Sequence, residues 1–307
     1  MRNTFARKLT ELANVDKDII LITGDLGFSV FDEFKERFPE QFLNIGLCEQ
    51  SMIGISAGMA LEGKKVFVYS IIPFLIYRTL EQIRNDLCYQ EVPVKLIGVG
   101  SGFAYGAEGG THHAIEDLGI MTSLPNMMVF SPGDPLEVEK IVENSLFFNQ
   151  PCYIRLNKNG DPIINTKETI KFFEIGKPLM IKGQNGKITI FSTGNTLSLG
   201  LEVFEELSNK NIKSCLYSFH TLKPIFSSYI KDIIKESEII VTIEEHFERN
   251  GIGYLISQQI VENQLTQKIL NFNLTDNIKH MVGSQNFLRE SYKITKSNII
   301  KSIFRII

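Results

Sequence analysis

The carboxyl group of Glu49 stands at the position in this sequence that best suits chemistry. It lies within Asn44–Gln50, between a short strand and a helix start that is rich in small residues such as Ser51 and Gly54. Glycines at such a junction let another molecular surface approach closely. A carboxyl group held there, away from water, can share a proton with a ring nitrogen of a ligand. The competing interpretation is structural, because the helix dipole also favours an acidic residue at a helix start.

Two adjacent histidines form a second candidate centre. His112 and His113 follow the glycine-rich run Gly106–Gly110. These glycines permit close approach of the backbone to a ligand, and imidazole suits proton transfer in a cleft near neutral pH. The alternative is a metal site. Adjacent residues of one loop rarely bind one ion together, and no third His or Cys stands nearby, so no metal ligand is predicted here.

The elements that must position these side chains alternate between strands and helices. Short β-rich runs are followed by longer amphipathic stretches through the first half of the chain. This order is typical of a parallel sheet covered by helices on both faces, so the predicted fold class is α/β. The expected strands are 19–23, 65–69, 94–99 and 127–130, and the expected helices are 2–13, 51–61, 75–90, 115–124 and 135–149.

A second, smaller α/β unit is predicted after a polar linker. Residues 157–162 are rich in Asn, Lys and Asp, and irregular sequence continues to about residue 178. Two domains are therefore expected, residues 1–160 and 179–307, joined by a linker at 161–178. Strands of the second domain are expected at 187–191, 213–217 and 239–243 and near 279–282, with a last helix within 293–307.

Composition argues against several classes of function. The chain has 307 residues and a net charge of −3, which favours neither nucleic acid nor an anionic membrane as a partner. No apolar run reaches the roughly 18 residues of a membrane-spanning helix, and the first residues do not resemble a signal peptide. The four cysteines are widely spaced and read as reduced thiols. A cytoplasmic protein is expected.

The order of the motifs resembles one known family. The N-I-G-L-C-E-Q segment around Glu49 is followed by E-Q-I-R-N-D, then by G-A-E-G-G-T-H-H-A-I-E-D, L-P-N-M and S-P-G-D. This order resembles the thiamine-diphosphate-dependent transketolases, specifically their pyrimidine-binding domain followed by their C-terminal domain. Residues 218–224 and 241–246 extend the resemblance over nearly the whole chain. It implies transfer of a two-carbon ketol unit between sugar or sugar phosphate substrates.

The resemblance implies roles for residues on the cofactor side. Glu49 would be catalytic, binding the aminopyrimidine ring of thiamine diphosphate by a hydrogen bond and so activating the cofactor. Phe74 would stack on that ring with Tyr77 as a helper, although Phe74 also suits a core position. Asp25, in the segment Gly24–Ser29, matches an active-site aspartate of the family.

Phosphate recognition is implied for three residues. Ser29 and Arg155 match a serine and an arginine that contact substrate phosphate in the family. Arg2 has the separation from Asp25 that a second phosphate arginine would need, and the planar guanidinium suits this task. The alternatives are a surface ion pair for Arg155 and a mobile terminus for Arg2.

The remaining implied substrate contacts depart from the family pattern. His112 matches the catalytic histidine that acts on substrate protons. Glu108 and His113 stand at substrate-binding positions where the family has Asp and Gln. Gly100 stands where many transketolases carry a substrate-binding histidine. These departures leave the identity of the sugars open.

One part of the family's machinery is missing. The diphosphate and its divalent ion are bound through a G-D-G motif followed by an asparagine, and Gly24-Asp25-Leu26-Gly27 is the nearest string here. The chain is therefore predicted to be half an enzyme, with a partner subunit holding the diphosphate and Mg²⁺ or another divalent ion. An α2β2 assembly, in which this chain also self-associates, is expected. The alternatives are acyl transfer like that of deoxyxylulose-phosphate synthase, a 2-oxo acid dehydrogenase β chain, and a non-catalytic scaffold subunit.

Overall fold

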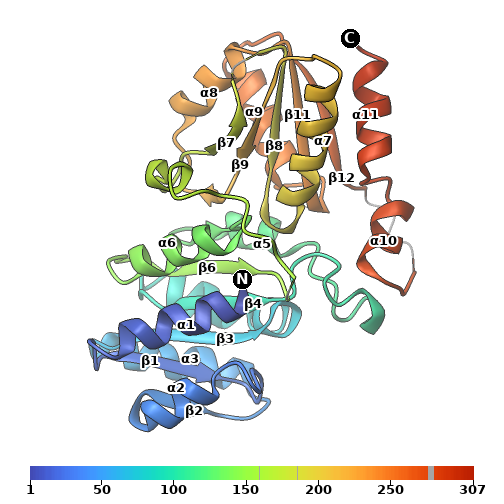
Figure 1. Cartoon of the computed structure of the whole chain (residues 1–307). Coiled ribbons are helices and arrows are strands. Elements are labelled where there is room, and N and C mark those ends of the chain that lie inside the picture. Colours follow the sequence, from blue (N-terminus) through green and yellow to red (C-terminus); the bar gives the residue numbers. More distant parts are fainter. Residues whose placement is uncertain (159, 185, 276–279) are drawn as a thin grey trace.

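Two α/β units lie one above the other in the computed structural model (Figure 1), which describes residues 1–158, 160–184, 186–275 and 280–307. Each unit is built on a sheet whose strands are mostly parallel and whose faces are covered by helices. The predicted fold class is therefore confirmed. Within the described ranges, no helix is both long enough and apolar enough to cross a membrane.

The first sheet has seven strands among the described residues, in the order β10-β5-β6-β4-β3-β1-β2. All neighbours pair in parallel except β10, which comes from the second half of the chain and runs antiparallel to β5. The strands are β1 (Ile19–Thr23), β2 (Phe42–Asn44), β3 (Lys65–Ile71), β4 (Lys95–Val99), β5 (Met128–Phe130), β6 (Cys152–Leu156) and β10 (Thr221–Lys223).

Alternate residues of the buried strands point to opposite faces of this sheet. In β1, Ile19 packs with Phe5 in one apolar layer, and Ile20 packs with Met52 in the other. A strand buried on both faces needs an unbroken apolar run, which explains the sequence of β1. One layer is covered by α1 (Arg2–Ala13), α2 (Asp32–Arg37) and α6 (Pro135–Ser145), and the other by α3 (Glu49–Leu61), α4 (Leu80–Gln82) and α5 (Asp117–Ser123).

The expectation of one continuous helix over residues 75–90 is wrong. The segment consists of π-helical turns at Pro73–Tyr77 and Ile83–Cys88, on either side of the short helix α4. A π turn accommodates one residue more than an α turn, so it changes the direction of the side chains that follow. Such turns often mark functional positions.

The second sheet has the strand order β12-β11-β8-β9-β7, with only β7 antiparallel to its neighbour among the described residues. No strand is present at residues 280–282, contrary to expectation, and Lys279 of that prediction lies outside the described residues. The strands are β7 (Leu179–Gly183), β8 (Ile188–Ser192), β9 (Ser214–Ser218), β11 (Ile239–Phe247) and β12 (Lys268–Leu274), and the helices are α7 (Leu197–Asn209), α8 (Ser227–Lys235), α9 (Ile252–Glu262), α10 (Gln285–Ser291) and α11 (Lys296–Phe304).

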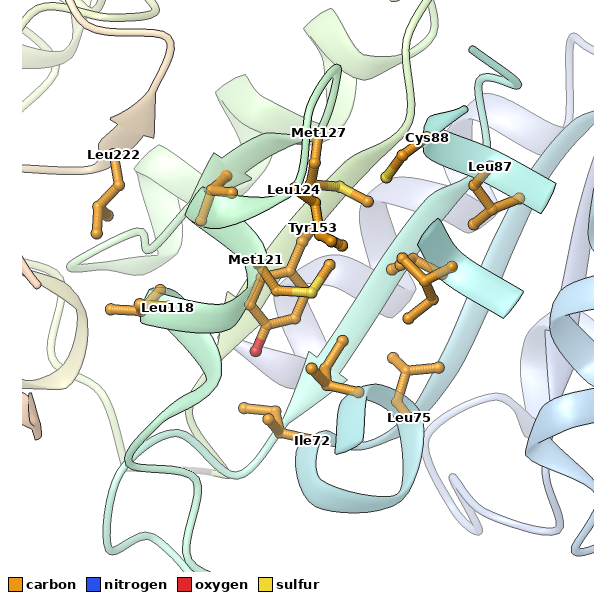
Figure 2. Close-up of a cluster of buried hydrophobic side chains, with 14 of the residues drawn as sticks. Ile72, Leu75, Leu87, Cys88, Leu118, Met121, Leu124, Met127, Tyr153 and Leu222 are labelled. Atoms are coloured by element: carbon orange, nitrogen blue, oxygen red, sulfur yellow. The ribbon is translucent and has the colours of Figure 1, made fainter. Parts of the chain in front are cut away.

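The two units share one apolar core. Figure 2 shows Met121 and Leu124 near Tyr153 of β6, with Leu118 and Leu222 on the side toward the second domain. Leu222 belongs to β10, so the strand that crosses from the second domain contributes both backbone pairing and apolar burial. The relative position of the domains is therefore set by a packed interior rather than by a linker alone.

A buried pair of carboxyl groups anchors the linker. Asp134 caps α6 by accepting from Glu137 N at 3.0 Å, and its second oxygen accepts from Ile164 N and Asn165 N at 3.0 and 2.7 Å. Glu137 in turn accepts from Gly133 N at 2.6 Å and from Asn165 Nδ2 at 3.2 Å. Burial, with the charge of Asp134 beside it, raises the pKa of Glu137 to about 7.

We expect the free energy of unfolding to fall as the pH rises toward 7. A carboxyl group whose folded-state pKa lies above its unfolded value stabilises the fold at low pH, and that stability is lost as the pH rises through the folded pKa. For Glu137 the loss is at most about 3 kcal/mol. Glu137→Gln removes this titration. The free energy of unfolding of the variant, relative to that of the wild type, should therefore be higher at about pH 8.5 than at about pH 5.

Urea denaturation at those two pH values, with Glu205→Gln at an exposed position of α7 as the control, measures this difference. An equal offset between Glu137→Gln and the wild type at both pH values would contradict the assignment. Burial also raises the pKa of Glu244 to about 7. Because Glu244 is present in the wild type and in both variants, its contribution cancels in the comparison.

Candidate active site

Glu49 begins α3 at the carboxyl edge of the first sheet, where ligands of open α/β sheets bind. Its side chain is 1% exposed although its neighbours Cys48 and Gln50 are exposed. Oε2 of Glu49 accepts from Nη1 of Arg78 at 2.8 Å. The half-exposed Arg78 therefore compensates the charge of a carboxylate that is otherwise withdrawn from solvent.

Arg78 connects Glu49 to the ring of Phe74, and through it to the ring of His112. Its guanidinium carbon lies 5.1 Å from the ring centroid of Phe74, one helical turn earlier. The Phe74 ring meets the His112 ring edge to face, with centroids 5.2 Å apart. Three segments that are distant in the sequence thus place Glu49, Phe74 and His112 in one continuous series of contacts. Arg78 is the member that sequence reasoning missed, and its spacing of four residues from Phe74 was the available signal.

The loop after β1 adjoins the same edge. Asp25 N donates to Oδ1 of Asn44 at 2.9 Å, and the same oxygen accepts from Gly46 N at 3.0 Å. Asn44 therefore ties the Asp25 loop to the segment that leads into Glu49. Asp25 and Ser29 are both exposed and both have positive φ, 56° and 62°. Strained backbone of this kind is often found at ligand-binding sites.

A group of charged residues lies beside His112. Lys158 Nζ stands 4.4 Å from the ring centroid of Tyr105 and 3.7 Å from Oε1 of Glu108. The Tyr105 ring centroid is 6.3 Å from that of His112. Burial raises the pKa of Tyr105, and the nearby charge of Arg2 opposes that rise. Lys158, paired with Glu108, thus lies over the Tyr105 ring, and Arg2, which hydrogen-bonds to the side chain of Tyr69, acts on Tyr105 through its charge.

The N-terminus that carries Arg2 is held in place. The amino group of Met1 pairs with Oδ2 of Asp161 at 3.0 Å, and Asn157 Nδ2 donates to the other oxygen of Asp161 at 2.6 Å. The Met1 side chain is itself buried. The structure therefore places Arg2 in a fixed position beside the candidate site, rather than on a mobile terminus.

Comparison with known proteins shows the family to which the chain belongs. Residues 1–160 match the model of the transketolase pyrimidine-binding domain, and residues 178–299 match that of the transketolase C-terminal domain. The chain belongs to the transketolase family. Its resemblance to that family, including the order of the two domains, is thereby confirmed.

Individual relatives agree with the family match. The chain is 32% identical over 303 residues to one of the subunits of the apulose-4-phosphate transketolase of Phocaeicola vulgatus, covering 98% of this chain and 95% of the relative. It is 29% identical to the 1-deoxy-D-xylulose-5-phosphate synthase of Clostridium kluyveri, of which it spans only 48%. A solved structure described as a split gene transketolase, inactive beta4 tetramer, superposes with a TM-score of 0.88 at 28% identity, covering 99% of this chain and 97% of that one.

Tyr77 holds two segments of this transketolase-family site together. Its hydroxyl donates to Oε2 of Glu116 at 2.7 Å and accepts from Glu116 N at 3.3 Å. Burial, with Asp117 and Glu116 nearby, raises the pKa of Tyr77 well above its usual value, so the hydroxyl stays a donor. Tyr77 therefore joins the Phe74 segment to the loop that carries His112.

The prediction that Arg155 binds substrate phosphate is wrong for this structure. The guanidinium is fully buried and pairs with Asp117 at 2.8 and 3.2 Å. It also donates to the backbone oxygens of Ala114 and Glu245 at 2.7 and 3.2 Å. Asp117 accepts a further bond from Tyr153 at 2.6 Å. Arg155 thus serves an internal ion pair that joins the domains, not an exposed anion site.

The position of His113 does not support its predicted contact with substrate. Its side chain is 7% exposed, and its ring packs edge to face against Phe103 with centroids 5.2 Å apart. Nε2 of His113 lies 3.3 Å from the carbonyl oxygen of Gly106. Of the two adjacent histidines, only His112 faces the site. Lys158, three residues after Arg155, lies at the candidate site, unlike Arg155 itself. Sequence reasoning missed Lys158.

We expect Arg155 and Lys158 to differ sharply in their effect on stability. Arg155→Met leaves Asp117 buried without its partner, so it should lower the free energy of unfolding by about 3–5 kcal/mol. Lys158→Met removes only a partly exposed pair and should cost about 1 kcal/mol or less. Urea denaturation of the two variants measures both values. Equal stabilities would show that the Arg155 ion pair does not hold the fold.

Proposed function

We propose that this chain is the pyrimidine-binding subunit of a split transketolase-like enzyme that uses thiamine diphosphate to move a two-carbon ketol unit between sugar or sugar phosphate substrates. The observation that carries the proposal is the contact series from Glu49 through Arg78 and Phe74 to His112. It combines a buried proton acceptor, an aromatic ring and a histidine at the carboxyl edge of one sheet.

The residues present fit the aminopyrimidine of the cofactor. A flat ring with a basic nitrogen needs an acidic hydrogen-bonding group and an aromatic surface, and Glu49 and half-buried Phe74 supply them. When bound, thiamine diphosphate would supply the nucleophilic carbon that carries the ketol unit. Glu49 would hold a proton at the ring nitrogen, and His112 would exchange protons with substrate hydroxyls. Asp25, with Tyr77 as a helper, would border the cofactor, and Ser29, Glu108, Lys158 and Arg2 would border the substrate.

A partner subunit is proposed to hold the diphosphate and its divalent ion. Within the described residues, no group of three or more His, Cys, Asp or Glu side chains could hold a metal. Two solvent-exposed apolar side chains flank the site. Phe28 is 75% exposed and Leu47 is 72% exposed. Exposed apolar surface of this kind marks an interaction site. An α2β2 assembly that covers Phe28, Leu47 and the exposed face of α3 would place the cofactor between subunits.

We expect thiamine diphosphate and Mg²⁺ to bind only when the partner subunit, sought in the product of the adjacent gene, is co-purified with this chain. Glu49→Gln should lower ketol transfer by the complex at least about 100-fold, because the amide cannot exchange a proton with the ring nitrogen. Calorimetry and a transfer assay measure the two effects. Glu62→Gln, at the exposed far end of α3, is the matched control.

The opposite results have definite meanings. Tight cofactor binding by the lone chain would contradict the split arrangement. A well-formed complex that binds no cofactor would favour the non-catalytic scaffold instead.

The two histidines offer a second test. We expect His112→Asn to lower kcat/KM by a factor on the order of 100–10,000, the range of general acid–base catalysis. His113→Asn should change turnover little, because that ring packs against Phe103 away from the site. Its effect should appear in thermal stability. If both variants lost turnover equally, the assignment of His112 alone to the site would fail.

Acyl transfer remains a second candidate because a deoxyxylulose-phosphate synthase is among the relatives. That reaction would use a 2-oxo acid donor rather than a ketose. Incubating the complex with pyruvate or with a ketose phosphate, each with an aldose acceptor, and identifying the products by mass spectrometry separates the two. A product that forms only from pyruvate would show that the proposed function is acyl transfer and not ketol transfer.

A further inference from the structure

Tyr105 fills the space in the site that a side chain on residue 100 would need. Gly100 follows β4 with φ of +95°, and a Cβ atom built on it would lie 2.2 Å from Cε2 and 2.3 Å from Cδ2 of Tyr105. Side chains do not tolerate contacts that short. The glycine and the ring therefore depend on each other, beyond the strain that any other residue would meet at this φ.

The ring of Tyr105 stands between the catalytic histidine and the charged rim of the site. On one side its centroid is 6.3 Å from that of His112. On the other, Lys158 Nζ lies 4.4 Å from the centroid, a distance at which a cation is attracted to an aromatic face. Glu108 N donates to the carbonyl of Tyr105 at 3.0 Å, while the Glu108 carboxylate pairs with Lys158. Tyr105 thus helps to orient Lys158.

The hydroxyl end of Tyr105 lies in the field of a second cation. Burial raises the pKa of Tyr105, Arg2 lowers it and Glu108 raises it. The net rise keeps the hydroxyl protonated, so it remains a neutral hydrogen-bond donor beside Arg2. The ring therefore has one cation over its face, whereas Arg2, which hydrogen-bonds to the side chain of Tyr69, affects Tyr105 only through its charge.

We propose that Tyr105 determines the length of the sugar that the site accepts. The inference rests on the proposed function, since it concerns the acceptor of that reaction. Because the ring occupies the space next to Gly100, it leaves less room there for a long substrate. An anionic group of the substrate would then meet Lys158, whose Nζ lies over the Tyr105 ring. The class of substrate that fits is a short aldose with a terminal phosphate or another anionic group.

The test uses the complex of both subunits with thiamine diphosphate and Mg²⁺. Glyceraldehyde 3-phosphate and ribose 5-phosphate serve as short and long acceptors. Tyr105→Ala should raise KM for the short acceptor by about tenfold or more while kcat changes little, and should shift the ratio of the two kcat/KM values toward the long one by about tenfold. Tyr105→Phe keeps the ring and should retain the wild-type ratio. Tyr89→Ala, at an exposed tyrosine, is the control. An unchanged ratio in Tyr105→Ala would overturn the proposal.

A double-mutant cycle tests the dependence of the ring on Gly100. In the wild type, Gly100→Ala should lower Tm and raise the KM for glyceraldehyde 3-phosphate. Both effects should be smaller in the Tyr105→Ala background, because the ring that the new methyl group would strike is absent. Additive effects would show that the two positions are independent and would contradict the proposal.

Failure of the inference is distinguishable from failure of the proposed function. A complex that transfers ketol units but shows the same acceptor ratio in Tyr105→Ala keeps the function and loses the inference. If the wild-type complex transfers nothing, calorimetry with glyceraldehyde 3-phosphate and ribose 5-phosphate still decides the role of Tyr105. Weaker binding of the short compound by Tyr105→Ala would then support it. Equal binding, or no binding of either compound to the wild type, would overturn it.

Discussion

One buried carboxylate, that of Glu245, supports much of the arrangement of the two domains and the site. Glu245 lies in β11, two residues after the regular pairing ends at Ile243, and is fully buried, where an unpaired charge would be costly. It accepts from Phe103 N at 2.9 Å and Asn195 Nδ2 at 2.8 Å, and it pairs with Arg289. Burial raises the pKa of Glu245, but the charge of Arg289 and these hydrogen bonds outweigh it and lower the value. The carboxylate therefore stays ionised and joins the start of the His112 loop to the second domain.

The other end of that loop is held by the second buried charge pair. Asp117 is bound by Arg155 and Tyr153, and Arg155 reaches across to the backbone of Glu245. Between these two anchors the loop carries Tyr105 and His112, whose rings lie 6.3 Å apart. The second domain, which supplies none of the residues assigned to the candidate site, thus helps to position that site. It fixes the loop from behind while leaving its outer face open.

The candidate site divides into two neighbouring regions of different character. Glu49, Arg78 and Phe74 form a region that is partly buried and aromatic, suited to a flat heterocycle. Tyr105, Lys158 and Arg2 form a charged rim, suited to an anionic substrate. His112 touches both, since its ring lies near Phe74 on one side and Tyr105 on the other. Under the proposed function, His112 would lie between the cofactor and the substrate, where a group that transfers protons is needed.

What the sequence determined by itself is the local structure and the types of residue at the site. The apolar run of β1, the small-residue helix after Glu49 and the glycines before His112 are short-range signals. The order of the motifs led to the family. Only the tertiary structure decided which way neighbouring side chains point. His112 and His113 are adjacent yet face opposite sides, and Arg155 turned out to be interior, because their partners Phe103, Asp117 and Glu245 are assembled by contacts as remote as the 142 residues between Phe103 and Glu245. The placement of β10 in the first sheet has the same origin. Burial and pairing depend on which distant segments pack together, and no local pattern of residue types encodes that choice.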